Sequence, residues 1–251
     1  MPRLVISLFG PLRVTLDGEP VSGFESDKVR ALLAYLAVET EVPHRREKLA
    51  GLLWPDQPES VARANLRHVL ASLRKALGDG ARSPDRAASP HFLHISRQTI
   101  QFSRASDAWV DVQAFIDLLQ TKLSANQQTL HQLEEAVELV HGAFLEGFSL
   151  PGCYAFEEWV LFEGERLQRL VMEALERLSD HYEQQGNVER ALAYAWRQVE
   201  QEPWREGAHL QVMRLLALSG QRSAALAQYE TCRRSLVEEL GVDPGADTTQ
   251  L

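Results

Sequence analysis

"ARANLRHVLASLRKALGDG", residues 62–80, has the pattern of an amphipathic helix. At about 100° per residue, one side of this helix carries a stripe of leucines that predicts packing against a core. The stripe consists of Leu66, Leu70, Leu73 and Leu77. We expect the opposite arc to be exposed, and it carries Ala64, His68, Ala71, Ser72 and Lys75, with Arg67 at its edge. The expected outer face therefore combines basic and small side chains, although the whole chain has a formal net charge of −9.

An outer face of this kind suits the surface of duplex DNA. Small side chains let a helix approach a groove closely, while cations beside them can meet phosphates. We expect Arg67 and His68 to touch base edges, and Asn65 to pair with adenine or with a phosphate. Arg63 and Lys75 belong to the same candidate DNA-binding surface, together with Ser72 of the outer arc. For this helix alone, the alternative is a basic face that is merely solvated.

Two neighbouring segments carry cations where the same docking geometry would need them. The preceding short helix, "RREKLAGLLW" (45–54), opens with Arg45, Arg46 and Lys48, the place from which a helix-turn-helix contacts the DNA backbone. After the helix, "HFLHI" and "TIQF" predict a β-ribbon with Arg97 at its tip, where the guanidinium could enter a minor groove. DNA binding therefore becomes the favoured interpretation.

The order of elements in the first part of the chain also agrees with it. Before residue 25, "LVISLF" and "LRVTL" predict strands, and Asp17-Gly18 is a hairpin-type turn. Ser26 precedes a third helical pattern in "DKVRALLAYLAVE". Strands, three helices and a hairpin are the order of an OmpR-type winged helix, which we place at residues 1–104. The small-residue and proline loop "ARSPDRAASP" (81–90) is expected to be mobile.

The remainder, residues 105–251, predicts an all-α domain with an internal repeat. Six positions recur 34 residues later with similar residues, among them Ala174 and Ala208, Gly186 and Gly220, and Ala191 and Ala225. Thirty-four residues is the tetratricopeptide (TPR) period, in which small residues lie where paired helices touch. The fold class is thus mainly α, with an N-terminal α+β winged helix-turn-helix followed by a TPR-like helical repeat domain.

Charge divides the chain at the same point. Residues 1–104 hold 15 Lys and Arg against 11 Asp and Glu, whereas residues 105–251 hold 11 against 24. This asymmetry predicts different partners for the two halves. The chain has two cysteines far apart, no apolar run long enough for a membrane span, and no pattern of a signal peptide. We therefore expect a cytoplasmic, nucleoid-associated protein that does not bind a membrane.

Catalysis and metal binding find little support in the sequence. The phosphate-binding, dinucleotide, zinc-protease and serine-hydrolase motifs are missing from it. His91 and His94 are three apart on an expected strand, so their side chains point to opposite faces and do not share a metal. We expect no enzyme activity, no cofactor and no metal site.

The motifs also carry a family resemblance. "LVISLFGPLRVTLDGEPV", "KVRALLAYLAV", "REKLAGLLWPD" and "ARANLRHVLASLRKALGD" resemble the winged helix of SARP-type bacterial transcriptional activators. "DAWVDVQAF", "GAFLEGFSLPGCYAFEEWVLFEGERL" and "ALAQYETCRRSLVEELGVDPG" are similar to the bacterial transcriptional activator domain (BTAD) that follows it in that family. Together these segments run over essentially the whole chain.

The resemblance implies an activator that binds direct repeats near promoters, often as a homodimer, and contacts RNA polymerase. By position it places Arg63, Arg67 and His68 on the family's recognition helix, and Arg97 on its wing. One departure is Ser72, where many members carry Arg, so base readout or phosphate contact there is left open. Many members continue into an ATPase and sensor region, so a DNA-binding fragment of a larger regulator stays open as well.

A rival interpretation belongs to another class of protein. In it the helical repeats form a protein-interaction scaffold, and the basic helix is only a solvated face. Salt-dependent binding to duplex DNA separates this scaffold from the activator.

Overall fold

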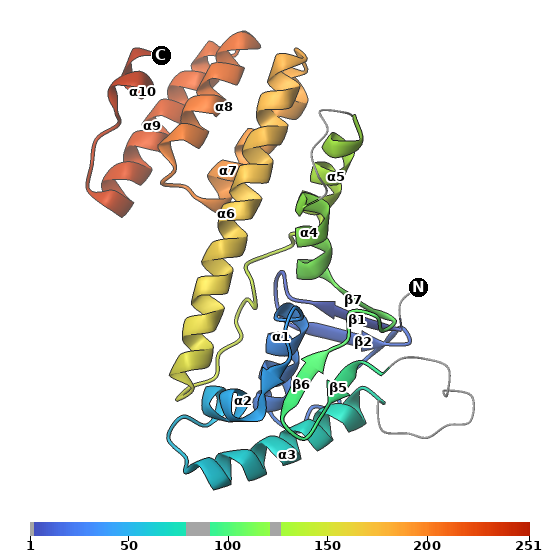
Figure 1. Cartoon of the computed structure of the whole chain (residues 1–251). Coiled ribbons are helices and arrows are strands. Elements are labelled where there is room, and N and C mark those ends of the chain that lie inside the picture. The colour runs from blue at the N-terminus through green and yellow to red at the C-terminus, as the bar shows by residue number, and fades with distance from the viewer. Residues whose placement is uncertain (1–2, 79–90, 121–126) are drawn as a thin grey trace. The chain divides into compact units, whose positions relative to one another are not determined.

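A computed structural model describes residues 3–78, 91–120 and 127–251, and the loop predicted at 81–90 lies outside them. The chain divides into two compact units. Unit 1 comprises residues 1–123 and 138–167, and unit 2 comprises residues 124–137 and 168–251. The helix α6 (Tyr154–Gln184) contributes its first part to unit 1 and its second part to unit 2. Figure 1 labels most of the elements of the two units.

Unit 1 begins with a small sheet whose strand order is β3-β2-β1-β7. Its strands are β1 (Leu4–Ser7), β2 (Arg13–Leu16), β3 (Glu19–Pro20) and β7 (Ala108–Val110). In β1, Leu4 and Ile6 are buried and alternate with partly exposed neighbours, as a sheet with one covered face requires. Asp17 and Gly18 have positive φ angles of 53° and 87°, which confirms the predicted turn between β2 and β3.

The helices of unit 1 follow in the predicted order. The first three are α1 (Asp27–Val38), α2 (Arg46–Leu53) and α3 (Glu59–Ala76). A two-residue strand, β4 (His44–Arg45), lies between α1 and α2 and pairs with β6 (Thr99–Phe102), which pairs in turn with β5 (Leu93–Ile95). Helix α3 packs on α1 and α2. This arrangement of three helices and a β5–β6 hairpin is a winged helix-turn-helix (Figure 1).

Residues beyond 104 complete the first sheet. Strand β7 pairs in parallel with β1 and leads into α4 (Asp111–Gln120). The buried Asp111 carboxylate accepts backbone N–H bonds of 2.8–2.9 Å from Leu8 and Phe9 and one of 2.7 Å from Val112. Burial raises the pKa of Asp111, although these hydrogen bonds oppose the rise. The compact unit therefore continues past residue 104, and the domain boundary proposed there stays a prediction.

A later segment also packs into unit 1. The Trp159 ring lies 5.0 Å from that of Tyr35 and 5.7 Å from that of Phe144, and its indole N–H donates to Glu39 Oε1 at 3.0 Å. Buried Cys153 donates its thiol hydrogen to the Leu53 carbonyl. The beginning of α6 is therefore part of the core around α1 and α2.

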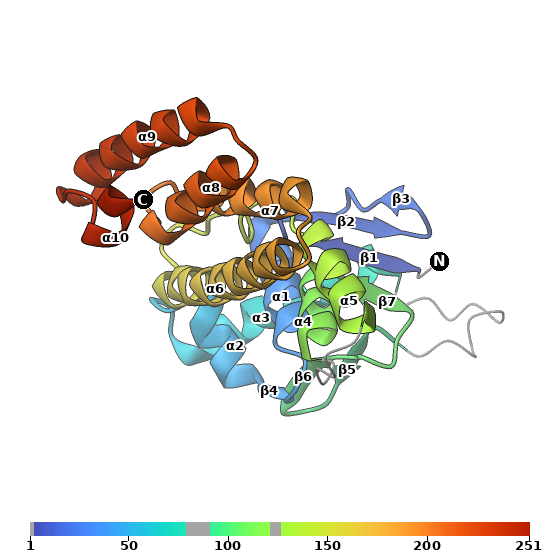
Figure 2. The same ribbon diagram turned by 90° about the horizontal axis from the view of Figure 1, so that it is seen from above.

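Unit 2 is helical and repeats with the predicted period. Within it, α7 (Val188–Gln201), α8 (Glu206–Leu218) and α9 (Arg222–Leu240) pack on their neighbours in sequence (Figure 2). The other helices are α5 (Gln127–Glu138), which precedes α6, and the short α10 (Ala246–Gln250). Helix α8 ends 34 residues after α6, and α9 begins 34 residues after α7. The TPR-like repeat is thus visible in the helix boundaries themselves.

The two equivalent turns of the repeat share one geometry. Gly186 and Gly220 have φ angles of 74° and 78°, a left-handed conformation that glycine adopts without a Cβ penalty. In each turn the following residue donates its backbone N–H to the residue five positions earlier, Asn187 to Tyr182 and Gln221 to Leu216, both at 2.9 Å. The repeated glycine in the sequence therefore marks a repeated helix end.

Candidate nucleic-acid interface

The buried side of α3 is rotated from the side that the leucines indicate. Ala62, Val69 and Leu73 are buried along with Leu66 and Leu70. At 100° per residue, the centre of the first three lies roughly 80° from Leu70. All four leucines of the stripe are buried, as predicted, but the other three fall on the same side of Leu70, so the face opposite Leu70 is not the centre of the exposed side.

This rotation corrects one predicted site residue. Ser72 is 6% exposed, and its hydroxyl oxygen has no hydrogen-bond partner among the described residues. It lies at the edge of the buried half of α3, so it does not belong to the outer face on which we placed it. Asn65 and Ala64 are half-buried at the margins of that face.

The exposed arc of α3 carries four cationic or titratable side chains. Arg67, His68 and Lys75 are exposed as predicted, and Ala71 is exposed between them. Arg74, which is not among the site residues predicted from the sequence, joins the same arc. Its spacing of seven residues from Arg67 could have placed it there, since i and i+7 share a helix face. None of these four side chains forms an ion pair with an acid in the part of the chain that the structure describes.

Arg63 differs from these cations because acids already surround it. Its guanidinium lies 2.8 Å from a carboxylate oxygen of Glu47 and 2.5 Å from one of Glu59. Glu47 belongs to α2 and Glu59 to the first turn of α3. Arg63 therefore connects two helices, and its charge is balanced locally.

The three cations at the start of α2 have different surroundings. Arg46 donates to the Ser96 carbonyl from Nε at 3.2 Å and from a terminal nitrogen at 3.0 Å, and its backbone N–H donates to the Gln98 carbonyl at 2.9 Å. The Lys48 ammonium lies 5.6 Å from the Tyr35 ring centroid, and contact with Tyr35 raises the pKa of Lys48. Arg45 is exposed. Arg46 thus anchors the hairpin, while Arg45 and Lys48 keep charge on the surface.

The wing is a well-bonded hairpin with Arg97 at its tip. The Ser96 hydroxyl oxygen accepts the backbone N–H groups of Gln98 and Thr99 at 3.1 and 2.8 Å, which closes the turn around Arg97. The Arg97 side chain is exposed and has no ion-pair partner within the described ranges. The turn therefore presents a cation from a fixed backbone.

Two adjacent residues hold these elements in one arrangement. Arg46 joins the first turn of α2 to the hairpin, and Glu47 joins the same turn to α3 through Arg63. The exposed cations of α3, α2 and the hairpin are thus presented by a single framework. In DNA-binding folds of this kind, the second helix of the motif enters the major groove while the elements around it contact phosphates.

The described residues contain neither a metal-ligand cluster nor a membrane-spanning helix. No three His, Cys, Asp or Glu side chains gather there as a metal site. None of the described helices is both long enough and apolar enough to cross a membrane.

Fold and surface define a class: a winged helix-turn-helix with a basic outer face, followed by TPR-like helical repeats. The chain belongs to the bacterial transcriptional activator domain family, whose model matches residues 110–251. The resemblance to SARP-type activators is thereby confirmed.

Named relatives extend the similarity over the N-terminal part. The transcriptional regulatory protein EmbR of Mycobacterium tuberculosis is 29% identical over 252 residues, which cover 97% of this chain and 61% of EmbR. The regulatory protein AfsR of Streptomyces coelicolor is 30% identical over 96% of this chain and 23% of AfsR. The transcriptional regulator RedD of the same species is 29% identical over 96% of this chain and 67% of RedD.

A solved structure shows the same architecture. The structure of M. tuberculosis EmbR in complex with a low-affinity phosphopeptide superposes with a TM-score of 0.73 at 25% identity. It covers all of this chain and 64% of the EmbR chain. The present chain thus spans about six-tenths of EmbR and less than a quarter of AfsR.

Proposed function

We propose that this chain is a sequence-specific DNA-binding transcriptional regulator that activates transcription. The observation that carries the proposal is the exposed arc of α3, where Arg67, His68, Arg74 and Lys75 stand without acid partners among the described residues. The chain as a whole is acidic, so unpaired cations concentrated on one helix are matched to an anionic partner. The names of the relatives and of the family support transcription as the process.

Within the exposed arc of α3, some residues are placed to contact bases and others to contact phosphates. Arg67 and His68 lie in the middle of α3, flanked by Ala64 and Ala71, whose small side chains let the helix enter a groove. Arg74 and Lys75 lie in the last turn, where they would meet the backbone at the groove wall. Arg45, Lys48 and Arg97 supply further phosphate contacts from α2 and the wing. Arg46 positions the wing through the Ser96 carbonyl, and its contact with a phosphate stays a prediction.

Activation adds a second partner and a geometry on the DNA. We propose binding to direct repeats near a promoter, as a homodimer, with a contact to RNA polymerase. Support comes from the SARP-type resemblance and from the family description as a transcriptional activator domain. In this proposal the protein acts by binding DNA and contacting another protein, without catalysis. It does so in the cytoplasm, at the nucleoid.

The test is a salt titration of DNA binding with matched variants. We expect the whole chain to bind duplex DNA with a steep loss of affinity as salt rises, and to select a preferred sequence from a random pool. Arg67→Ala should cost roughly 1–3 kcal/mol on the selected sequence and relax its preference, whereas Arg74→Ala should weaken all sequences evenly and flatten the salt slope.

Arg233→Ala serves as the control, because Arg233 is exposed on α9 and pairs with Glu230 at 3.1 Å. It removes the same charge without touching α3. A folded protein that does not bind DNA at low salt would favour the interaction scaffold instead. Equal losses for Arg67→Ala and Arg233→Ala would show that α3 does not read bases.

A further inference from the structure

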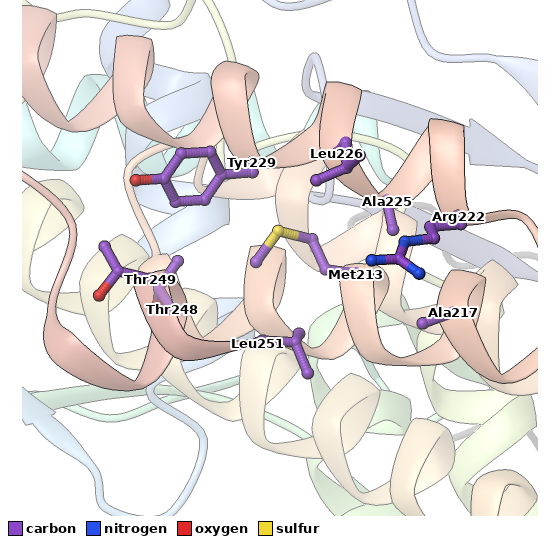
Figure 3. A pocket seen from close by; sticks show the side chains of 9 residues that line it. All are labelled: Met213, Ala217, Arg222, Ala225, Leu226, Tyr229, Thr248, Thr249 and Leu251. Atoms are coloured by element: carbon purple, nitrogen blue, oxygen red, sulfur yellow. The ribbon is translucent and has the colours of Figure 1, made fainter.

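A pocket of about 540 Å³ opens within unit 2, between α8, α9 and α10. This volume lies in the range of sites that bind small molecules. Figure 3 shows side chains from all three helices around it, with Met213 at its centre. The pocket is distinct from the DNA-binding surface, which belongs to unit 1.

Most of the pocket wall is apolar. Met213, Ala217 and Ala225 line it, and Leu226 and Leu251 border it while 63% and 61% exposed. Leucine side chains this open to water gain from contact with an apolar ligand. The wall therefore favours a ligand with an apolar body.

One cation stands at the edge of this apolar wall. Arg222 begins α9, and Figure 3 shows its guanidinium directed over the pocket toward Met213. None of the nine residues that line the pocket is acidic, and Arg222 forms no ion pair with the described residues. Its charge is thus available to a ligand.

Several other arginines of unit 2 have acidic partners, which Arg222 lacks among the described residues. Four of them lie within 4 Å of a glutamate carboxylate, in a region rich in acids. They are Arg190 with Glu134, Arg205 with Glu176, Arg214 with Glu183, and Arg233 with Glu230. Arg222 is exposed at the edge of an apolar wall, where its guanidinium can form a charge-assisted hydrogen bond to an anion.

We propose that this pocket binds a small amphipathic carboxylate, with its apolar body on Met213 and Leu226 and its carboxylate on Arg222. The planar guanidinium presents two parallel N–H donors that match a carboxylate. At the other end of the pocket, Figure 3 shows the Tyr229 and Thr249 oxygens, which accommodate a polar substituent on the ligand. A cationic ligand finds no acidic partner on this wall. The site goes beyond the proposed function and does not depend on it.

Calorimetric titration of the whole chain with octanoate tests the site. We expect saturable binding of octanoate, and at least about tenfold weaker binding of 1-octanol and octylamine, which share its chain but lack its carboxylate. Absence of octanoate binding to folded protein would overturn the proposal. Equal affinity for octylamine would also overturn it, because Arg222 would then not select the anion.

Matched variants locate the ligand. Arg222→Gln should weaken octanoate about tenfold and leave 1-octanol unchanged, since it replaces the charged guanidinium by a neutral polar side chain. Arg233→Gln removes the same charge from the same helix outside the pocket and should leave octanoate affinity at the wild-type value. Ala225→Trp fills the half-exposed wall and should abolish binding of both compounds. Octanoate affinity that is unchanged in Arg222→Gln and Ala225→Trp would place the ligand elsewhere and overturn the proposal.

Discussion

The contacts inside unit 1 join residues that are far apart in the sequence, whereas the contacts inside unit 2 join helices that follow one another in it. In unit 1, β1 pairs with β7 across about a hundred residues, and the buried Asp111 carboxylate binds the backbone of Leu8 and Phe9. In unit 2, α7 packs on α8 and α8 on α9, so neighbours in space are neighbours in sequence. Damage to a distant segment should therefore unfold unit 1, whereas damage in unit 2 should stay local to a repeat.

Truncation provides the largest expected effect. A fragment of residues 1–104 lacks β7, Asp111 and the segment of α6 that carries Trp159, so β1 loses a strand partner and two buried N–H groups lose their acceptor. We expect this loss to remove most of the roughly 5–15 kcal/mol that holds a typical domain. The fragment 1–167 should retain cooperative unfolding. Thermal circular dichroism of both fragments checks this, and a cooperative transition in 1–104 would contradict the long-range description.

A single substitution tests how far the stability of unit 1 depends on Asp111, which lies beyond residue 104. Asp111→Ala leaves buried N–H donors of Leu8, Phe9 and Val112 without their acceptor, and we expect a loss of roughly 2–4 kcal/mol in unfolding free energy. Asp117→Ala on the same helix is the control, because the exposed ion pair of Asp117 with Arg104 should contribute less than about 1 kcal/mol. Urea denaturation compares them, and equal losses would show that Asp111 is not a special anchor.

The contrast between units also explains how far the sequence could predict the structure. The TPR-like repeat can be predicted from the sequence because Gly186 and Gly220 serve local turns, and Ala174, Ala191 and Ala208 are buried in helices. The pairing of β7 with β1 could not be read, since three residues such as Ala108–Val110 carry no mark of a distant partner. Hence the proposed boundary at residue 104 and the compact unit do not coincide.

In the candidate site, too, the local sequence predicts some features, whereas others depend on contacts between distant elements. Exposure of Arg67, His68, Lys75 and Arg97 followed from local periodicity and turn position. Burial of Ser72 depends on where α1 and α2 press against α3, which a helical wheel centred on Leu70 does not contain. The pairing of Arg63 with Glu47, and of Arg46 with Ser96, likewise arises only when separate elements meet.

The repeat itself supplies a matched pair of substitutions with a smaller effect. Ala191 is fully buried, whereas its counterpart Ala225 is half-exposed and lines the pocket in unit 2. Ala191→Leu should therefore overpack a helix contact and cost about 1–3 kcal/mol, while Ala225→Leu should change stability by less than about 0.5 kcal/mol. Chemical denaturation measures both, and equal losses would mean that α9 is as tightly enclosed as α7.

The smallest expected effect is a pH dependence at the contact between α8 and α9. His209 is buried, with Nε2 2.8 Å from the Pro203 carbonyl oxygen and Nδ1 2.6 Å from the Gln228 amide nitrogen. Since a carbonyl only accepts, Nε2 carries the hydrogen and Nδ1 accepts from Gln228. A proton added at Nδ1 would face the amide N–H, and burial lowers the pKa of His209 below 6.5 despite opposing contributions from Pro203 and Glu206.

The sign of the dependence follows from which state binds the proton first. As pH falls through 6.5, the unfolded chain protonates His209 before the folded chain does, so the unfolded state is favoured. The stabilising contribution of neutral His209 is therefore complete above pH 6.5 and is lost as pH falls toward the lower pKa of the folded protein. Comparison of wild type with His209→Gln across pH 5–8 isolates this group from the other histidines. We expect the stability difference to favour wild type most at high pH and to shrink on acidification. A difference that grows as pH falls would mean that the folded protein holds the charged imidazole.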